Sequence, residues 1–578
     1  MIAITILVAW CVLVVTFICR RVARARKNYS AAKDCGFPVF YSPVSPTEPL
    51  WLLLYPLLNP LIDKLPSSWT FPWLYVSQAY RIYASRHAVY EAVGSDTFIL
   101  ATPVKNVLST CDPAVIHQVF TRARDFPPDL APIKVLEVYG RSLVSTKGDE
   151  WKVHRRLVNN GLSTDAQVLA WEEGSFQAES LVQHWLDTGA SVENLRRFTS
   201  TLVLHVLSRS FYGKRRYWAA EEEVPPNHTM SFSGAKRTLL ESLKLIAILP
   251  RPLLTRLPFA STKAAAESYF EWSAYMKEMR QDILDHAEER LKKPKKTLLE
   301  HLVLARLNHE DVQNLHEDYA LSNIFLVMLA GLETTGSTLA FTIMLLAIYP
   351  EWQKRIQSHL DDYFGDRPRE EWNMQQDYDA LRESVLWAAI NESMRVYGVV
   401  QHLFRETETS VSVQDSAGIQ HTIPPQTACM LNFAACHHNP ARWTPEECTA
   451  ERRAKLADSP ALNFQPERFL ANKQAGKSNP AGPTFFPFGQ GWRQCPGERF
   501  AAVEITAVFA TIYKSYSIEL EVTAETLAEC QGDAQTAWEV TRDEATRTLW
   551  FEAKASIRAQ MSAERHLKFK VTPRSKKA

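Results

Sequence analysis

The sequence lacks the features that mark several classes of protein. Its formal net charge is +1 over 578 residues, so bulk charge gives no reason to expect a nucleic-acid partner. After residue 65, no glycine- or serine-rich linker, low-complexity tract or internal repeat divides the chain, and we expect one large domain. The nine cysteines are odd in number and scattered, which favours reduced thiols over a disulfide framework.

One cysteine, Cys495, stands in unusual surroundings, because three glycines, a proline and aromatic residues frame it in segment 488–497. The nearest other cysteine and histidine, Cys530 and His438, lie too far along the chain for the close ligand spacing of zinc or iron–sulfur sites. A thiolate that is the only protein ligand points to haem, where the porphyrin supplies four donors. The alternative is a buried, inert cysteine.

The neighbours of Cys495 suit a haem ligand. The glycines allow the backbone to approach a flat macrocycle closely. Arg493 offers a fork of donors suited to a carboxylate such as a haem propionate. The residues from Glu498 onward predict a helix, whose positive N-terminal end would stabilise a nearby thiolate.

The N-terminus predicts a membrane anchor. Residues 1–19 carry no charged side chain, and as a helix they would span about 28 Å, close to the thickness of a bilayer core. Five basic residues follow between positions 20 and 27, which places this side in the cytosol. Because a short apolar run with a small-residue cleavage site is lacking, we expect an uncleaved signal anchor.

A second apolar segment, 49–62, is too short and too rich in proline to span a bilayer. It could dip into the membrane face or pack on the catalytic domain. The predicted organisation is therefore an anchor with its basic flank (1–27), a linker and membrane-proximal segment (28–65), and a catalytic domain (66–578).

Five residues around Cys495 form the pattern Phe-x-x-Gly-x-Arg-x-Cys-x-Gly, which resembles the haem-binding loop of cytochrome P450s. They are Phe488, Gly491, Arg493, Cys495 and Gly497. The resemblance implies haem b as the cofactor, Cys495 as the iron ligand and a P450 fold: mainly α-helical, with small β-sheets. One N-terminal transmembrane helix is expected in addition.

The apolar run 319–350 predicts a long helix. A buried core helix fits it better than a membrane span, because Glu333 at bilayer depth would cost at least ~2.5 kcal/mol. Its segment Ala330–Thr335 resembles the P450 distal motif, in which Glu333 and Thr334 would pass protons to bound oxygen. Gly331 would let the helix widen locally. The alternative for Thr334 is a hydrogen bond to its own helix.

Three further residues resemble the buried ionic knot behind the P450 haem. Glu392 and Arg395 lie one turn apart in the predicted helix 381–396, and Arg468 follows in the segment Phe464–Phe469. We assign these residues to structure rather than to chemistry.

Other positions match family residues that contact haem propionates. Trp151 and Arg155 form the pattern Trp-x-x-x-Arg, which places both on one helix face, and Arg405 matches a further propionate-binding position. The tripeptide Cys436–His438 could suggest a metal, but it resembles an ordinary P450 segment and we expect no metal there.

The resemblance implies a monooxygenase that acts on a lipophilic small molecule. No flavin or dinucleotide fingerprint is present, so electrons would come from NADPH through the flavins of a partner, NADPH–cytochrome P450 reductase. The anchor implies contact with membrane lipid: a single-pass protein, of the endoplasmic reticulum, with its catalytic domain in the cytosol. Candidate substrate-lining residues are those of the segment Val399–Phe404 and four on the long helix: Ile324, Phe325, Met328 and Leu329.

The whole chain resembles filamentous-fungal P450s, which predicts a role in secondary metabolite biosynthesis. Two alternatives remain open. One is a P450-fold isomerase or dehydratase that works without reductase, although the pair Glu333 and Thr334 argues against it. The other is a non-catalytic haem sensor.

Overall fold

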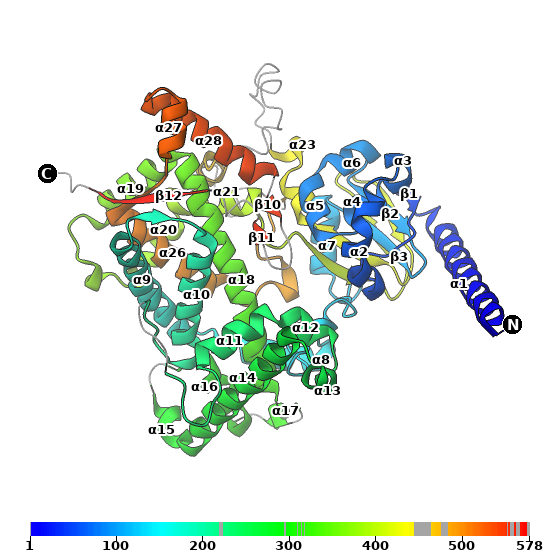
Figure 1. Ribbon diagram of the computed structural model, residues 1–578, viewed down its shortest axis with the longest axis horizontal. Helices are drawn as coiled ribbons and strands as arrows, with labels where there is room; N and C mark the ends of the chain where they lie inside the picture. Colours follow the sequence, from blue (N-terminus) through cyan, green and yellow to red (C-terminus); the bar gives the residue numbers. More distant parts are fainter. Residues whose placement is uncertain are drawn as a thin grey trace. The chain divides into compact units, whose positions relative to one another are not determined.

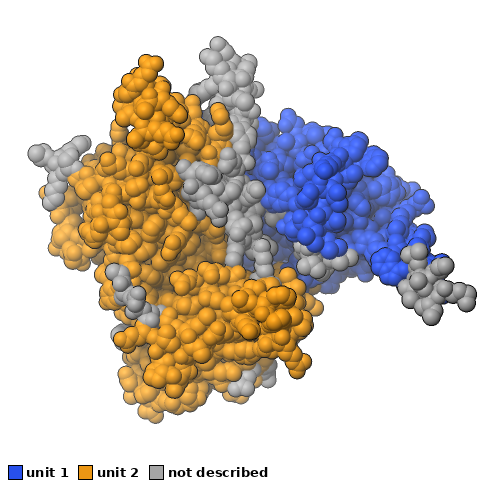
Figure 2. Space-filling view, viewed as in Figure 1, with its two compact units in different colours: residues 1–132, 392–495, 554–561 blue, residues 133–391, 496–553, 562–578 orange. Residues whose placement is uncertain are grey.

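The computed structural model divides into two compact units, each described by itself (Figure 2). Unit 1 comprises residues 1–132, 392–495 and 554–561, and unit 2 comprises residues 133–391, 496–553 and 562–578. Each unit is thus built from segments far apart in the sequence. The residues that the structure describes are 2–218, 223–293, 296–308, 310–313, 315–316, 318–443, 464–474, 484–551, 553–554, 560–561 and 567–574.

Unit 1 is organised by a five-stranded sheet of order β1-β2-β3-β8-β5 (Figure 1). β2 pairs antiparallel with β3, β3 pairs parallel with β8, and β5 pairs antiparallel with β8. Every residue of β2, β3 and β8 is buried, which explains why these strands are continuously apolar or small rather than alternating. The sheet strands are β1 (Val39–Tyr41), β2 (Thr97–Ala101), β3 (Asn106–Thr110), β5 (His402–Glu406) and β8 (Ala428–Asn432).

Short helices and a hairpin complete unit 1. Asp112 caps α7, because its carboxylate accepts hydrogen bonds from the backbone N–H groups of Ala114 and Val115 at 2.8 and 3.1 Å. The hairpin is β6 (Val411–Gln414) with β7 (Gln420–Ile423). The helices are α1 (Ile2–Ala32), α2 (Pro49–Ile62), α3 (Ser67–Thr70), α4 (Trp73–Val76), α5 (Ala79–Ser85), α6 (Ala88–Val93), α7 (Pro113–Thr121), α22 (Phe433–His437), α23 (Pro440–Trp443), α25 (Glu467–Gln474) and the 3-10 turn η5 (Gly491–Arg493).

The two halves of α1 have different surroundings. Toward its C-terminal end α1 packs against the rest of unit 1: Arg21 pairs with Glu48 at 2.6 Å, and Asn28 Nδ2 donates to Thr102 O at 2.8 Å. The helix continues past residue 27 to Ala32 without a break. Toward the N-terminus large apolar side chains are exposed, namely Val8, Trp10, Val12, Leu13, Val15, Phe17 and Ile18.

Unit 2 is almost entirely helical. α9 packs on α26 and α10, and α10 packs on α18. The approach of α10 to α18 requires a glycine, because a Cβ at Gly336 would lie 3.2 Å from Ser200 Cα. A three-stranded sheet of order β4-β12-β9 covers one end, from β4 (Ser191–Val192), β9 (Tyr516–Leu520) and β12 (Phe569–Pro573). A short pair, β10 (Ala553–Lys554) and β11 (Gln560–Met561), falls between β9 and β12 in sequence, and all of it except Ala553 belongs to unit 1.

The helical elements of unit 2 extend over most of its length, and the boundary with unit 1 falls inside α21. They are η1 (Lys134–Leu136), α8 (Gly148–Gly161), α9 (Thr164–Asp187), α10 (Leu195–Tyr212), α11 (Phe232–Glu241), α12 (Leu243–Ile248), α13 (Arg251–Arg256), α14 (Ala260–Asp285), α15 (Ala287–Lys292), α16 (Leu298–Asn308), α17 (Glu310–Gln313), α18 (Tyr319–Ile348), α19 (Pro350–Phe364), η2 (Arg369–Glu371), α20 (Met374–Arg382), α21 (Val385–Val396), α26 (Glu498–Ser515), α27 (Ala524–Glu529) and α28 (Ala534–Phe551).

The expected mainly α fold with small sheets is confirmed, and two predicted helix boundaries are corrected. The run 319–350 ends at Ile348, because Pro350 begins α19 at a position that suits proline. The run 381–396 divides between α20 and α21, where the Ser384 hydroxyl accepts from Leu386 N at 3.2 Å. Among the described residues α18 has the length and composition of a membrane span, yet 67% of its apolar window is buried. That burial is typical of a core helix.

Candidate functional site

The cysteine loop of unit 1, residues 485–495, is fixed largely by backbone contacts. Cys495 N donates to Phe488 O at 2.9 Å, and Gln494 N donates to Gly491 O at 3.1 Å. Gly491 has φ +70° and lies against α7, where a Cβ would come within 2.4 Å of Phe120 O. Only glycine fits both requirements. The loop therefore presents Cys495 on its exposed side in a fixed backbone conformation.

Contacts from α7 and α22 support the start of the same loop. Phe486 N donates to His437 Nε2 at 3.0 Å. Burial, with a smaller effect of Arg395, lowers the pKa of His437 to about 3, so the ring is neutral and can accept this bond. Phe120, Phe433 and Phe486 form an aromatic cluster with ring centroids 5.9–6.0 Å apart.

The tripeptide Cys436–His438 does not form a metal cluster by itself. His437 accepts from the loop backbone, and His438 Nδ1 bonds to Ala434 O at 2.7 Å. Cys436 donates to Thr484 O at 3.5 Å. The three side chains therefore have separate hydrogen-bond partners.

The predicted ionic knot lies behind the loop in unit 1. Arg395 Nη2 donates to Glu392 Oε1 at 2.8 Å, and Arg468 Nε donates to the same oxygen at 3.3 Å. Arg395 also donates from Nη1 to His437 O at 2.8 Å, so the knot reaches the histidine that supports Phe486. Both Glu392 and Arg395 are fully buried. The knot thus supports the cysteine loop through His437.

Arg405 on β5 is the strongest indication of an anionic ligand in unit 1. Arg405 is 7% exposed. Its Nη1 donates to Phe404 O at 3.0 Å, and its guanidinium carbon lies 5.9 Å from the centroid of the Phe120 ring. No carboxylate pairs with it among the described residues. Burial lowers the pKa of Arg405 to about 10. A buried cation without a counter-ion is costly, so these surroundings suit the carboxylate of a bound group such as a haem propionate.

The other predicted propionate partners lie on two elements, η5 and α8. Arg493 is half-buried at the end of η5, two residues before Cys495. In unit 2, Trp151 and Arg155 are half-buried one turn apart on α8. Between them His154 is fully buried, with Nδ1 2.7 Å from Asn323 Nδ2 on α18. Burial lowers the pKa of His154 to about 4, so this ring is a neutral anchor between α8 and α18.

The middle of α18 is the one part of this helix that opens to solvent among its described residues. Ala330 is exposed, and Leu329, Glu333 and Thr334 are half-buried. By contrast, the predicted lining residues Ile324, Phe325 and Met328 are buried. Phe325, for example, contacts the Trp272 ring at 5.6 Å. The exposed part of α18 is therefore confined to the segment around Ala330.

Glu333 and Thr334 have defined partners within unit 2. Thr334 Oγ1 donates to Ala330 O at 2.8 Å, the helix bond that the sequence left open as an alternative. Glu333 Oε2 accepts from Arg196 Nη2 at 2.7 Å. The helix keeps α geometry through Gly331, so the widening expected there is absent. Arg196 was missed because it lies on α10, remote in sequence from Glu333, and carries no motif.

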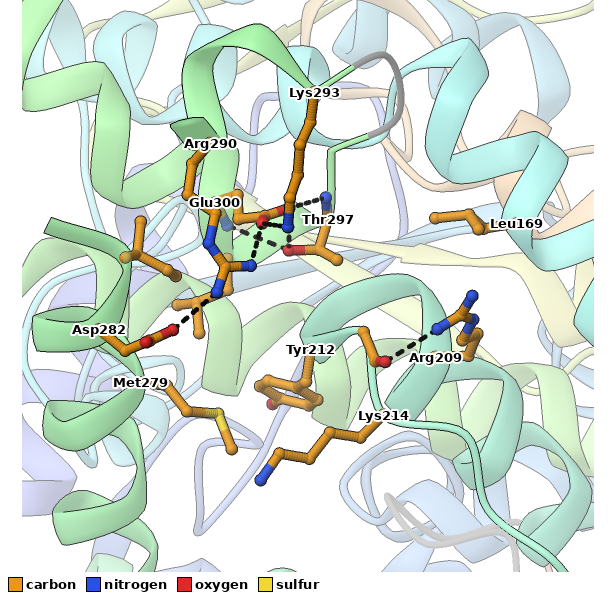
Figure 3. A pocket seen from close by; sticks show the side chains of 13 residues that line it. Leu169, Arg209, Tyr212, Lys214, Met279, Asp282, Arg290, Lys293, Thr297 and Glu300 are labelled. Carbon is orange, nitrogen blue, oxygen red and sulfur yellow. Dashed lines mark hydrogen bonds and ion pairs between the residues drawn. The ribbon is translucent and has the colours of Figure 1, made fainter. Parts of the chain in front are cut away.

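A solvent-open pocket of about 440 Å³ lies elsewhere in unit 2 (Figure 3). Glu300 lies in its wall and pairs with Arg290 at 2.8 Å and Lys293 at 3.3 Å. Asp282 pairs with Arg290 at 2.8 Å. The lining includes none of the predicted site residues, and its charged groups are largely occupied with one another. We therefore assign the candidate chemistry to the cysteine loop and α18.

Several known proteins are similar to this chain. The model of the cytochrome P450 family matches residues 64–536. The chain is 25% identical over 533 residues to a cytochrome P450 monooxygenase of Arthrobotrys oligospora, covering 85% of this chain and 88% of the relative. It is 26% identical to the phomenoic acid biosynthesis cluster cytochrome P450 monooxygenase of Leptosphaeria maculans, covering 89% and 92%.

Solved structures support the fold. The heme domain of cytochrome P450DA superimposes with a TM-score of 0.64 at 17% identity, covering 93% of this chain and 99% of that domain. A second P450 crystal structure, CYP102L1, gives a TM-score of 0.62 at 16% identity, covering 85% of this chain and 99% of that chain. At these identities the likeness concerns the fold alone.

Proposed function

Because the chain belongs to the cytochrome P450 monooxygenase family, we propose that it inserts one oxygen atom from O2 into a lipophilic small molecule. The observation that supports this most is the cysteine loop of unit 1, whose backbone presents Cys495. Unit 1 also contains the buried Arg405, with which no carboxylate pairs among the described residues. A thiolate ligand and a cation for a propionate are the two things that a haem-thiolate site requires from the protein.

The residues that match the family motifs would bind and orient haem b. Cys495 would ligate the iron through Sγ, and the loop backbone fixes where that sulfur lies. Arg405 and Arg493 would pair with propionates, together with Trp151 and Arg155 of α8, while Phe488 and Gly497 complete the motif. Bound haem would supply the oxygen activation that no side chain can perform.

Glu333 and Thr334 would deliver protons. The Thr334 hydroxyl already donates to Ala330 O, so its oxygen keeps lone pairs that can accept a proton donor. The Glu333 side chain is 21% exposed, which allows exchange with solvent, and Arg196 restrains its carboxylate. Proton transfer to Thr334 Oγ1 then requires Glu333 to leave Arg196, so we propose that this ion pair loosens during turnover.

The relatives support a role in fungal secondary metabolism, since one carries the name of a phomenoic acid biosynthesis cluster. We propose a lipophilic substrate, bound over the narrow face of α18 around Leu329 and Ala330. Its electrons would come from NADPH through NADPH–cytochrome P450 reductase.

The exposed apolar half of α1 supports a single-pass anchor in the endoplasmic reticulum membrane, with the catalytic domain in the cytosol. The helix α2 exposes Leu57 and Leu61 but buries Trp51, which supports packing on unit 1 with one face turned to lipid. Deleting residues 1–19 should release the protein from microsomes. It should leave the reduced-CO spectrum intact, because the Arg21–Glu48 pair remains.

The decisive experiment is turnover by the purified full chain, reconstituted with NADPH and reductase, on extracts of lipophilic metabolites. We expect NADPH-dependent products that contain one atom of labelled O2. Cys495→Ala should abolish both these products and the thiolate-type reduced-CO spectrum. Cys530→Ala, a change in the turn after α27, is the matched control and should alter neither.

Two other outcomes would overturn the proposal. Conversion of a peroxide or other oxygenated compound without NADPH would identify an isomerase or dehydratase. Haem binding without NADPH consumption on any extract would favour a sensor.

A further inference from the structure

A second group of metal-binding side chains lies in unit 1, outside the cysteine loop. His87, Asp96 and Cys111 each bring one potential ligand atom within 4.8 Å of the other two. His87 Nε2 and Asp96 Oδ1 are 2.9 Å apart. None of the three belongs to the P450 signature residues, and the sequence alone did not bring them together.

The backbone fixes the positions of all three residues. His87 directly precedes α6, and Gly94, with φ +74°, ends that helix and turns the chain toward β2. The β2–β3 pairing begins with Thr97 opposite Thr110, which places Asp96 across from Cys111. Cys111 N donates to Asp96 O at 2.8 Å and extends this register by one bond. The cluster is therefore preorganised by a short helix and a buried sheet.

The ligand types select the class of metal. A thiolate, an imidazole and a carboxylate suit Zn²⁺ and similar thiophilic divalent cations, whereas Mg²⁺ and Ca²⁺ prefer oxygen ligands only. Asn439 Nδ2 donates to Asp96 Oδ2 at 3.2 Å and orients the carboxylate, as outer groups do at metal sites.

The burial of the three residues also suits a metal site. Cys111 is fully buried, while the side chains of His87 and Asp96 are 14% and 28% exposed. A cation could therefore enter from solvent past the side chains of His87 and Asp96 and reach the buried Sγ of Cys111. Binding would release the thiol proton of Cys111 to solvent and form one metal–sulfur bond, with no change of oxidation state.

We infer that His87, Asp96 and Cys111 form a binding site for a thiophilic divalent cation of the zinc class, with the fourth position open to water. The cation would connect the β2–β3 end of the sheet to the turn at Asn439. That turn follows α22, which supports the cysteine loop through His437. The expected role is structural, in unit 1.

The test uses the full chain with haem, treated with a chelator and then titrated with Zn²⁺. Calorimetry and elemental analysis should give one zinc bound per chain. Cys111→Ser should weaken zinc binding by about tenfold or more. Cys429→Ser is the matched control, because Cys429 is a buried free thiol on β8 of the same sheet, and it should bind zinc as the wild type does.

His87→Gln guards against a folding defect in Cys111→Ser, because the histidine is partly exposed and its loss leaves the sheet intact. This variant should lose zinc while keeping the reduced-CO spectrum. The inference is overturned if the wild type binds no zinc at micromolar concentrations, or if His87→Gln binds zinc as tightly as the wild type. Either result would mean that the three side chains only hydrogen-bond to one another.

Discussion

The cysteine loop of unit 1 and the open stretch of α18 in unit 2 are stabilised in different ways. The loop depends on backbone hydrogen bonds, on a glycine pressed against Phe120 O and on a buried ionic knot. The α18 stretch depends on one hydroxyl bonded to its own helix and on one partly exposed ion pair, Arg196–Glu333. A metal ligand must stay in place, whereas a residue that carries protons must move, and the two regions differ accordingly.

The largest difference between the two regions should appear when each loses its glutamate. Glu392→Ala removes the buried carboxylate that Arg395 and Arg468 share, so it should cost about 3–5 kcal/mol of unfolding free energy, with loss of haem. Glu333→Ala removes a partly exposed pair and should cost about 1 kcal/mol or less. Denaturant unfolding and haem content measure both. An equal loss of unfolding free energy in Glu392→Ala and Glu333→Ala would contradict the proposed difference between the two regions.

A pair of glycines offers the next test. Gly491→Ala places a Cβ 2.4 Å from Phe120 O at a positive φ, so it should destabilise the protein by about 1–3 kcal/mol and perturb the reduced-CO spectrum. At Gly331 the new Cβ would meet Leu207 at an ordinary 3.5 Å, so Gly331→Ala should be neutral or gain up to about 1 kcal/mol. Melting temperatures of the two variants distinguish these outcomes. If Gly491→Ala melted at the wild-type temperature, the close packing of Gly491 against Phe120 would not be what fixes the loop.

Thr334 should affect chemistry and not stability. Thr334→Ala removes the hydroxyl, so reducing equivalents should be diverted to peroxide and product per NADPH should fall severalfold, with an unchanged melting temperature. Thr334→Ser keeps a hydroxyl and should retain most of the coupling. Peroxide release measured alongside NADPH consumption provides the readout. Unchanged coupling in the alanine variant would count against proton delivery through this residue.

The smallest change in stability is expected on substitution of a second buried glutamate, Glu504 on α26. Unlike Glu392 it has no hydrogen-bond or ion-pair partner among the described residues, and burial raises its pKa well above the ordinary value. As pH rises above about 4.3 the unfolded chain ionises this group first, so the folded state loses stability. Glu504→Gln should therefore melt at a higher temperature than the wild type at neutral pH.

The pH dependence provides the check. From about pH 6 to about pH 8 the advantage of Glu504→Gln over the wild type should grow, while Glu504→Asp, which keeps the carboxyl, should show none. A constant difference between wild type and Glu504→Gln across this range would mean that the carboxyl finds a partner in solution.

Local patterns in the sequence predicted those parts of the site that a short segment determines. The loop around Cys495, the spacing of Trp151 and Arg155 on α8, and the long buried helix α18 all follow from residues near one another in the chain. The knot of Glu392 with Arg468 was found only because a family resemblance joined two distant segments.

Contacts without a motif could not be predicted. Arg196 reaches Glu333 from another helix, and no pattern in either segment signals the pair. The unpaired state of Arg405 became visible only when its burial was known. The break before α21 depends on the cap at Ser384, where one hydroxyl outweighs a continuous helical pattern. These features depend on which surfaces meet in three dimensions.

The parallel pairing of β3 with β8 bears on how the protein is made. Val107 is matched with Ala428, so roughly 320 residues must be synthesised between the two partners. At about 5–20 residues per second this takes tens of seconds, and meanwhile one edge of β3 has no neighbour. The helices of residues 133–391 are complete before β8 leaves the ribosome, so the order of synthesis favours folding of that helical region first.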